Sequence, residues 1–474
     1  WQKALNSRKN WFVVILLFGL LLTFGFSNMA AFDEIRQDEA IRFEQLSNEN
    51  AQWARHNWNY SAYSGRVYDP TSPRDMRFGR RRVEYMAQYS NIVFRHHDRA
   101  QVYAQNLSDA IWENNRRAEL EYITNIHASL MTTYMRLFEN GDFNQVSAHH
   151  FENGISVFFE NRIDFHRSYY EFFRHFVDND IHFSYESEMT GFNFVYQIMR
   201  QLLPLIILVI VFMAIGDVFT SDNNSGSYKF LLLNPISRTK VFLAKIASAF
   251  SIAFVMIFVP LILSGIIMGA INGAGSANYP IMVQGDAFSS FVPLPNNLAT
   301  DTRTGYVTGE TFFGTFRFRL GSFNFTGAGY IPENPALGLT RFSSHAPYAN
   351  FFTPHENLTF TPMLSIMLMT LPLYALLILT AVAFLALMSV ISQRSLPTII
   401  ICLLIGMGAL AFPSPEADLS LLARLNPFAY INPVNILNGL GSTTMLTGIV
   451  VLAGISAIFL TAGILIFRRQ DIRC

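Results

Sequence analysis

The chain has 474 residues, of which 51% are apolar, and its 34 basic residues balance its 34 acidic ones, so no positive excess indicates a nucleic-acid partner. Its two cysteines, Cys402 and Cys474, cannot staple a large external domain, which excludes a disulfide scaffold and suits a bacterial envelope protein. Because the apolar residues gather into long uncharged runs, we expect an integral membrane protein with several helical spans.

The first apolar run predicts a membrane helix that enters from the cytoplasm. Lys3, Arg8 and Lys9 precede residues 11–32, which carry no charge. A cleaved signal peptide is the alternative, but its apolar core is normally only about 7 to 15 residues long. We therefore assign residues 1–32 to a cytoplasmic N-terminus and the first span, and we expect a few further residues ahead of the first one given.

Residues 33–195 predict a helical domain outside the membrane. Apolar residues recur at helical spacing over 120–137 and 159–177, which is typical of amphipathic helices that share a core. The pairs His96–His97 and His149–His150 could suggest a metal site, but neighbours on a helix point about 100 degrees apart and cannot easily bind one ion. We favour surface and half-buried histidines, and we expect no metal or cofactor on this chain.

Residues 196–272 contain two apolar runs, over 202–220 and 246–271, which predict the second and third spans. A polar break at 222–245 separates them. Within the break, Tyr228 and residues 230–233 form an apolar segment too short to cross a bilayer, so we expect a short helix on the membrane surface. Pro235 should end that helix, and Ser237 is placed to cap the next one. The basic residues that flank the apolar segment favour the cytoplasmic side.

Residues 273–357 predict a second external region, with short strands where aromatic and polar residues alternate over 315–325. Residues 358–474 predict the remaining spans and a proline-broken segment at 413–442, which should lie at the outer interface or re-enter without crossing. Three arginines near the C-terminus place that end inside. The fourth, fifth and sixth spans are expected over residues 362–391, 396–412 and 445–467.

The polar break resembles the cytoplasmic coupling loop of type-2 permeases of ATP-binding-cassette (ABC) transporters. From Gly226 to Arg238 it follows the pattern Gly-Ser-x-Lys-x-Leu-Leu-x-x-Pro-Ile-Ser-Arg, and residues 425–430, Leu-Asn-Pro-Phe-Ala-Tyr, are similar to an Asn-Pro-aromatic element of that family. The resemblance implies a polytopic α-helical membrane protein of six transmembrane helices with both termini in the cytoplasm. It also implies that the following residues couple the chain to an ATPase: Gly226, Tyr228, Lys229, Leu231, Leu232, Pro235, Arg238 and Lys240.

The sequence contains no Gly-x-x-x-x-Gly-Lys-Ser/Thr motif, so we do not expect the chain to hydrolyse ATP itself. The resemblance implies a separate P-loop ATPase subunit that holds ATP and Mg, and a second permease chain, identical or related. It further implies an exporter in the bacterial cytoplasmic (inner) membrane. The scarcity of charge in the spans favours an amphiphilic substrate, such as a peptide, a lipid or a drug-like molecule, over an ion.

Two functions of other classes remain open from the sequence. The chain could be a non-transporting membrane scaffold or sensor whose external domains bind a partner. A membrane-embedded hydrolase has only scattered histidines in its favour, because no nucleophile, base or metal constellation accompanies them. We therefore favour the permease.

Overall fold

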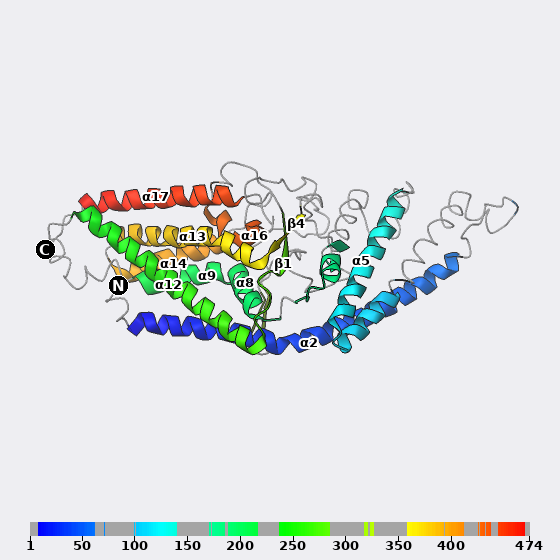
Figure 1. Ribbon diagram of the computed structural model, residues 1–474. Coiled ribbons are helices and arrows are strands. Elements are labelled where there is room, and N and C mark those ends of the chain that lie inside the picture. Colours follow the sequence, from blue (N-terminus) through cyan, green and yellow to red (C-terminus); the bar gives the residue numbers. More distant parts are fainter. Residues whose placement is uncertain are drawn as a thin grey trace. The chain divides into compact units, whose positions relative to one another are not determined.

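The computed structural model describes residues 8–61, 71, 99, 101–139, 170–171, 173–184, 188–216, 237–284, 317–320, 323–326, 358–392, 394–411, 425, 427–431, 433–437 and 444–469 (Figure 1). The chain divides into two compact units. The membrane unit comprises Trp1–Met29, Glu186–Ile331 and Thr359–Cys474, and the helical unit comprises Ala30–Tyr185 and Pro332–Leu358.

The first helix, α2 (Arg8–Ser61), does not end with its apolar run. It continues as one helix of 54 residues, whereas the sequence predicts a change from span to external domain at residue 33. Within α2, the segment Asn10–Ala30 is long and apolar enough to cross a membrane. A polar continuation follows because nothing in residues 31–37 breaks a helix: the stretch contains neither proline nor glycine.

The helical unit is built on α2 and on a helical hairpin. One arm of the hairpin covers residues 101–112, and the other is α5 (Arg116–Glu139), which confirms the amphipathic helix predicted from the apolar spacing over 120–137. Leu120 and Ile123 of α5 are buried, as that spacing requires. Of the second predicted helix, over 159–177, residues 170–171 and 173–177 lie within the described part of the chain and are helical.

The region of the predicted second span differs from its prediction, because its helices begin earlier and meet at a sharp bend, as in a broken span or a re-entrant loop. It consists of α8 (Gly191–Gln201), α9 (Leu203–Val209) and a short π-helix, η2 (Ile210–Ala214). The first two helices meet at Leu202, and the two halves of the span are bent by 64°. Pro204 lies in the first turn of α9, where its missing N–H costs nothing. The proline therefore marks the start of α9, the second of the two helices, and not the start of the whole predicted span.

The third span, α12 (Arg238–Asn272), crosses α8 at very close range. A Cβ atom on Gly191 would lie 3.0 Å from the backbone of both Gly265 and Gly269, so a side chain there would press the two helices apart by a few tenths of an ångström. Just beyond α12, the carbonyls of Gly273 and Ala274 accept hydrogen bonds of 3.0 Å from the first two N–H groups of α8. The outgoing end of α12 therefore caps the incoming end of α8.

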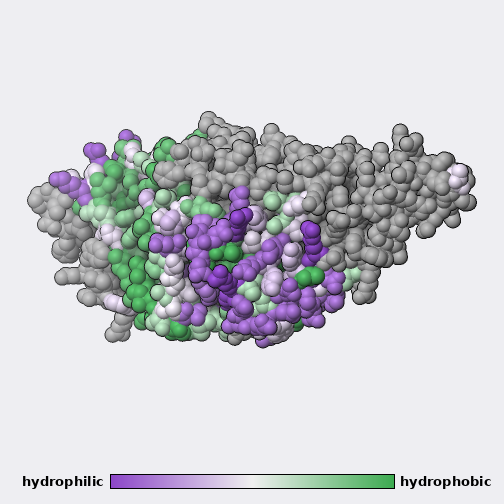
Figure 2. Space-filling view, turned by 45° about the vertical axis from the view of Figure 1, so that its right-hand side comes forward, coloured by the Kyte–Doolittle hydropathy of each residue, from purple (hydrophilic) through white to green (hydrophobic). Residues whose placement is uncertain are grey.

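The remaining helices of the membrane unit are α13 (Met363–Ser392), α14 (Ser395–Ala411) and α17 (Met445–Arg469). Helices α13 and α17 pack in parallel, since Thr380 bonds Ser456 at 2.8 Å and the rings of Phe384 and Phe459 are 5.4 Å apart one turn further along. Their exposed side chains and those of α12 are largely apolar, and Figure 2 shows hydrophobic residues gathered on the surface. Such a surface suits contact with lipid.

In the described residues, four helices are long and apolar enough to span a membrane, or five if the bent pair is counted as one span. The helix α14 is shorter, with an apolar stretch over Leu396–Gly406. A polytopic helical protein is thus confirmed, whereas the number six remains a prediction. Of the segment 413–442, the described parts form the short helices η6 (Pro427–Tyr430) and α16 (Pro433–Leu437), which contact α13 and α17.

Strands are few. The hairpin β2 (Arg317–Leu320) and β3 (Phe323–Thr326) is antiparallel, with Phe318 opposite Phe325, and it falls on the stretch where alternation predicted strands. A second pair joins β1 (Pro280–Gln284) to β4 (Leu358–Pro362), which leads directly into α13. The carbonyls of Ala277 and Tyr279 accept from the first N–H groups of α13, so the chain after α12 caps this helix too.

Candidate coupling site

The predicted coupling residues fall partly within the described chain. Gly226, Tyr228, Lys229, Leu231, Leu232 and Pro235 lie outside the described residues, because the description stops at Gly216 and resumes at Ser237. Arg238 and Lys240 are described, and they form the first turn of α12. The described part of the predicted site is thus the start of α12.

Ser237 begins α12 as the sequence predicts. Its backbone is extended, with φ −62° and ψ 140°, and its hydroxyl accepts a hydrogen bond of 3.4 Å from the backbone N–H of Lys240. This bond satisfies one of the four N–H groups that a helix start leaves without a helical partner. The cap fixes Ser237 as the residue at which α12 begins.

The charges in the first turn of α12 oppose the helix dipole. Arg238 and Lys240 are both basic, and no acidic residue accompanies them in that turn. A cation at the positive end of a helix is unfavourable by roughly 0.3–1 kcal/mol. The stability of α12 by itself therefore does not explain these two residues.

Arg238 also ties α12 to the end of α17. Its Nη1 donates a hydrogen bond of 3.2 Å to the carbonyl oxygen of Arg468, in the last turn of α17. The last four carbonyls of a helix have no helical N–H partner, and a guanidinium suits their negative end of the dipole. Lys240 is exposed beside it. The two predicted residues thus differ: one joins two helices and the other faces solvent.

An aromatic contact lies directly behind this bond. The rings of Phe242 and Phe467 are 5.3 Å apart, and both side chains are buried. The ring of Phe242 fits against Gly463, where an added Cβ would come within 2.8 Å of Cζ. The start of α12 is therefore packed into a notch of α17.

Several basic residues lie at this end of the helices. Because α13 and α17 are parallel, Arg394 just after α13 lies at the same end as Arg468 and Arg469. Together with Arg238 and Lys240 they form what we call the basic end of the membrane unit. The described residues at this end include no acid. The positive charge of the basic end favours binding of anionic partners. By the positive-inside rule, it also favours a position on the cytoplasmic side of the membrane.

Sequence reasoning missed the contact between α12 and α17. Phe242 and Gly463 are separated by more than 200 positions, and each lies in an apolar run with no pattern that pairs it with the other. A small residue inside a span indicates close helix packing in general, and that is the only signal Gly463 offers.

The comparisons with known proteins bear on the first part of the chain. A family model described as ABC-2 family transporter protein matches residues 1–283, which is more than half of the sequence. No curated protein and no solved structure matches the chain. The matched stretch contains α2, the broken second span, the predicted loop and all of α12.

Proposed function

Because this chain belongs to the ABC-2 family of transporter proteins and is thus a permease of an ABC transporter, we propose that it is the membrane subunit of an exporter. Its substrate is an amphiphile, peptide-like, lipid or drug-like, that leaves the cytoplasm or the inner leaflet. A separate P-loop ATPase that binds ATP and Mg supplies the energy, and a second permease chain completes the path. The basic end and both termini face the cytoplasm of a bacterial inner membrane.

The observation that supports this proposal is the way α12 is held at its two ends. One end begins at the cap of Ser237, directly after the predicted loop, and is fixed to α17 through Arg238. At the other end, Gly273 and Ala274 cap α8. With 35 residues, α12 is roughly 52 Å long, well beyond the about 30 Å of a hydrocarbon core. A push on the loop would therefore reach α8 through one continuous helix.

In this mechanism the loop residues have two tasks. Tyr228, Leu231 and Leu232 would enter an apolar groove of the ATPase, while Lys229 and Lys240 meet acidic residues around it. Gly226 and Pro235 would set the bends at the two ends of the segment. Arg238 would pass the movement on to α17. ATP-driven closure of the ATPases would then shift α12 and α8 and drive the substrate outward.

The test is co-purification and ATPase activity of the tagged full-length chain in mild detergent. The variant Leu232→Asp/Arg238→Glu/Lys240→Glu should lose the ATPase, or keep it without stimulation of its activity. The matched control is Arg117→Glu, a charge reversal at an exposed arginine of the helical unit, and it should retain both properties.

Two results would contradict the proposal. Unchanged stimulation in the triple variant would mean that the loop does not couple the subunits. A wild-type chain that purifies without any P-loop ATPase, or only with envelope proteins, would favour the scaffold or sensor.

A further inference from the structure

We propose that the tip of the helical hairpin, Trp112–Arg117, rests in the phospholipid headgroup layer of the bilayer that α2 crosses. The tip belongs to the helical unit and joins the arm at residues 101–112 to α5. The proposal adds a lipid contact to a unit for which the transport mechanism assigns no surface. It requires only that Asn10–Ala30 spans the membrane, and it does not depend on the substrate or on the ATPase.

Three hydrogen bonds fix the direction of the hairpin arm along α2. Ser47 Oγ donates to the carbonyl of Gln101 at 3.0 Å, and Ser108 Oγ donates to the carbonyl of Ala40 at 2.8 Å. The third contact is between Arg36 Nη2 and the carbonyl of Ile111, at 3.3 Å. Later residues of the arm contact earlier residues of α2. The arm therefore runs antiparallel to α2 and approaches Ala30.

The tip is the part of the hairpin that lies closest to Ala30 along α2. Arg36, which contacts it, lies six residues beyond Ala30, or roughly 9 Å along a helix. The guanidinium of Arg116 lies closer still to Ala30. It is 5.2 Å from the ring centre of Phe32, and Phe32 is only two residues beyond Ala30. A bilayer adds about 5 to 8 Å of headgroup region on each side of its hydrocarbon core. The contacts of the tip with α2 therefore lie roughly 3 to 9 Å beyond Ala30, so the tip reaches into the headgroup region from its outer boundary.

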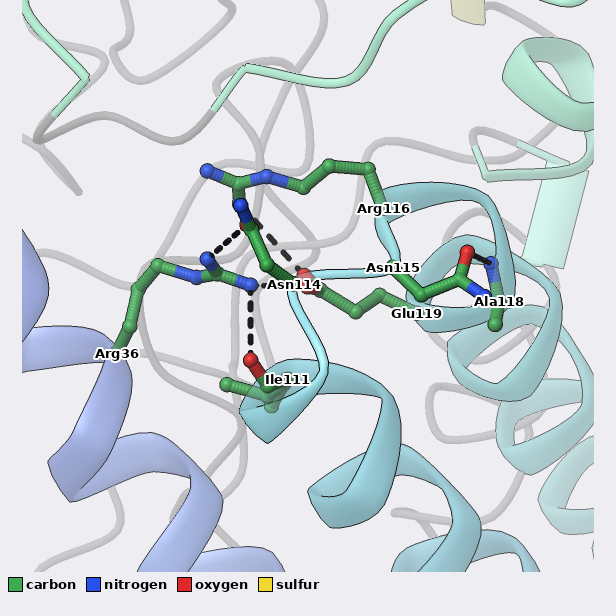
Figure 3. A network of polar contacts seen from close by, with 7 residues as sticks. All are labelled: Arg36, Ile111, Asn114, Asn115, Arg116, Ala118 and Glu119. Carbon is green, nitrogen blue, oxygen red and sulfur yellow. Dashed lines mark hydrogen bonds and ion pairs between the residues drawn. The ribbon is translucent and has the colours of Figure 1, made fainter.

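Polar contacts hold the tip against α2 (Figure 3). Arg36 forms a buried ion pair with Glu119, and its Nη1 donates a hydrogen bond of 2.5 Å to Asn114 Oδ1. Asn114 has φ 56°, a left-handed conformation that asparagine tolerates and that lets the chain reverse within the turn. Because the pair is buried against α2, the tip cannot leave the helix without exposing or unpairing a charge.

The exposed side chains of the tip suit a headgroup layer. Trp112 is 53% exposed, and tryptophan is enriched at membrane interfaces, where its ring meets both apolar and polar surroundings. The side chain of Arg117 is 71% exposed, and its partners Glu121 and Asp180, at 3.4 and 3.5 Å, form weak surface pairs. Because acidic and basic residues are mixed here, zwitterionic phospholipid should suffice and anionic lipid should not be required.

The experiment measures the depth of the tip in vesicles of phosphatidylcholine. A bimane fluorophore is placed at Glu113→Cys, in a full-length chain that carries Cys474→Ser and retains the buried Cys402. The vesicles contain phosphatidylcholine with a nitroxide on its headgroup. The matched control is Val102→Cys, which is on the same hairpin arm and is 51% exposed in the native chain, but lies roughly 15 Å further from the tip.

We expect strong quenching of bimane at residue 113 and little at residue 102. In the background of Trp112→Ala, quenching at residue 113 should fall, because the anchoring ring is lost. Equal quenching at the two positions, or none at residue 113, would overturn the proposal. A dependence on anionic lipid would overturn the assignment to zwitterionic headgroups. Since Trp112, Val102 and Glu113 are exposed, these variants should fold, which thermal unfolding of each would verify.

Discussion

The hydroxyl of Tyr374 donates a hydrogen bond of 2.5 Å to the carbonyl oxygen of Met199. Tyr374 is a fully buried residue of α13, and Met199 lies in the last turn of α8, where the second span breaks. A break leaves carbonyls without helical N–H partners, and the interior of a membrane offers no water to replace them. The tyrosine thus supplies a donor from another helix and stabilises the broken span.

Tyr374→Phe should therefore destabilise the membrane unit. The change keeps the ring and removes one buried hydrogen bond, at an expected cost of about 1 kcal/mol or more in the free energy of unfolding. A thermal-unfolding series in detergent should show a lower midpoint for this variant. Tyr122→Phe, at a half-buried tyrosine of the helical unit, is the comparison, and an equal shift in both would refute a special role for Tyr374.

Gly463→Ala should disturb the contact between α12 and α17. The new Cβ would lie 2.8 Å from Cζ of Phe242, whose buried ring rests on Phe467 and has little room to move. Overpacking of this kind costs about 1–3 kcal/mol. We expect a lower unfolding midpoint and, because the helix start shifts, weaker stimulation of the ATPase.

The same helix offers the control. Gly454 has nothing within 4 Å of an added Cβ, so Gly454→Ala should be neutral, or stabilising by up to about 1 kcal/mol through helix propensity. Phe242→Leu should partly rescue Gly463→Ala, since it removes the atoms that the new methyl group meets. Similar losses at Gly454 and Gly463 would show that the notch is unimportant.

These residues also show what the sequence could predict. The cap at Ser237 and the amphipathic helix α5 are local features, encoded by a hydroxyl at a helix start and by apolar spacing, and both were predicted. The break at Leu202 was missed, because Pro204 in an apolar run fits the start of a span as well as a break. Of the eight predicted coupling residues, six lie outside the described chain.

Contacts between distant segments could not be predicted at all. Arg36 and Glu119 are both charged residues in polar stretches, which normally indicates solvent exposure, yet both are buried. Phe242, Gly463 and the carbonyl of Arg468 meet because helices far apart in the sequence pack together. A single sequence carries the preference for such packing but not the identity of the partner.

Acid should weaken the helical unit through His127. This residue of α5 is fully buried and stacks on Phe173 with ring centres 6.0 Å apart. Burial lowers the pKa of its imidazole from 6.5 to about 3. The unfolded chain therefore binds a proton between these pH values that the folded chain excludes, so the free energy of unfolding falls as the pH drops below about 6.5.

The measurement is thermal unfolding of the full chain at about pH 7.5 and about pH 5.5, between which His127 should remove about 1.4 kcal/mol of stability. His127→Leu should reduce this pH dependence, whatever its effect at neutral pH. The comparison is His182→Gln, at an exposed histidine, which should keep the full dependence. An unchanged dependence in His127→Leu would contradict the assignment.

The buried pair at the hairpin tip should respond unequally to the loss of either partner. Besides Arg36, Glu119 also faces Arg116 at 3.6 Å, so Arg36→Met leaves the carboxylate with one guanidinium nearby. Glu119→Leu instead leaves two guanidinium groups close together without their carboxylate. Removing one partner of a buried pair costs about 3–5 kcal/mol. We expect Glu119→Leu to reach that range and Arg36→Met to fall below it.

A double-mutant cycle measures the coupling between the two residues. Arg36→Met/Glu119→Leu should cost less than the sum of the single changes, by about 0.5–3 kcal/mol, because the second substitution removes the charge that the first left unpaired. Arg117→Met breaks only exposed pairs and should cost at most about 1 kcal/mol. Additive losses would mean that Arg36 and Glu119 are not coupled, and a larger cost for Arg36→Met than for Glu119→Leu would mean that Arg116 does not share the carboxylate.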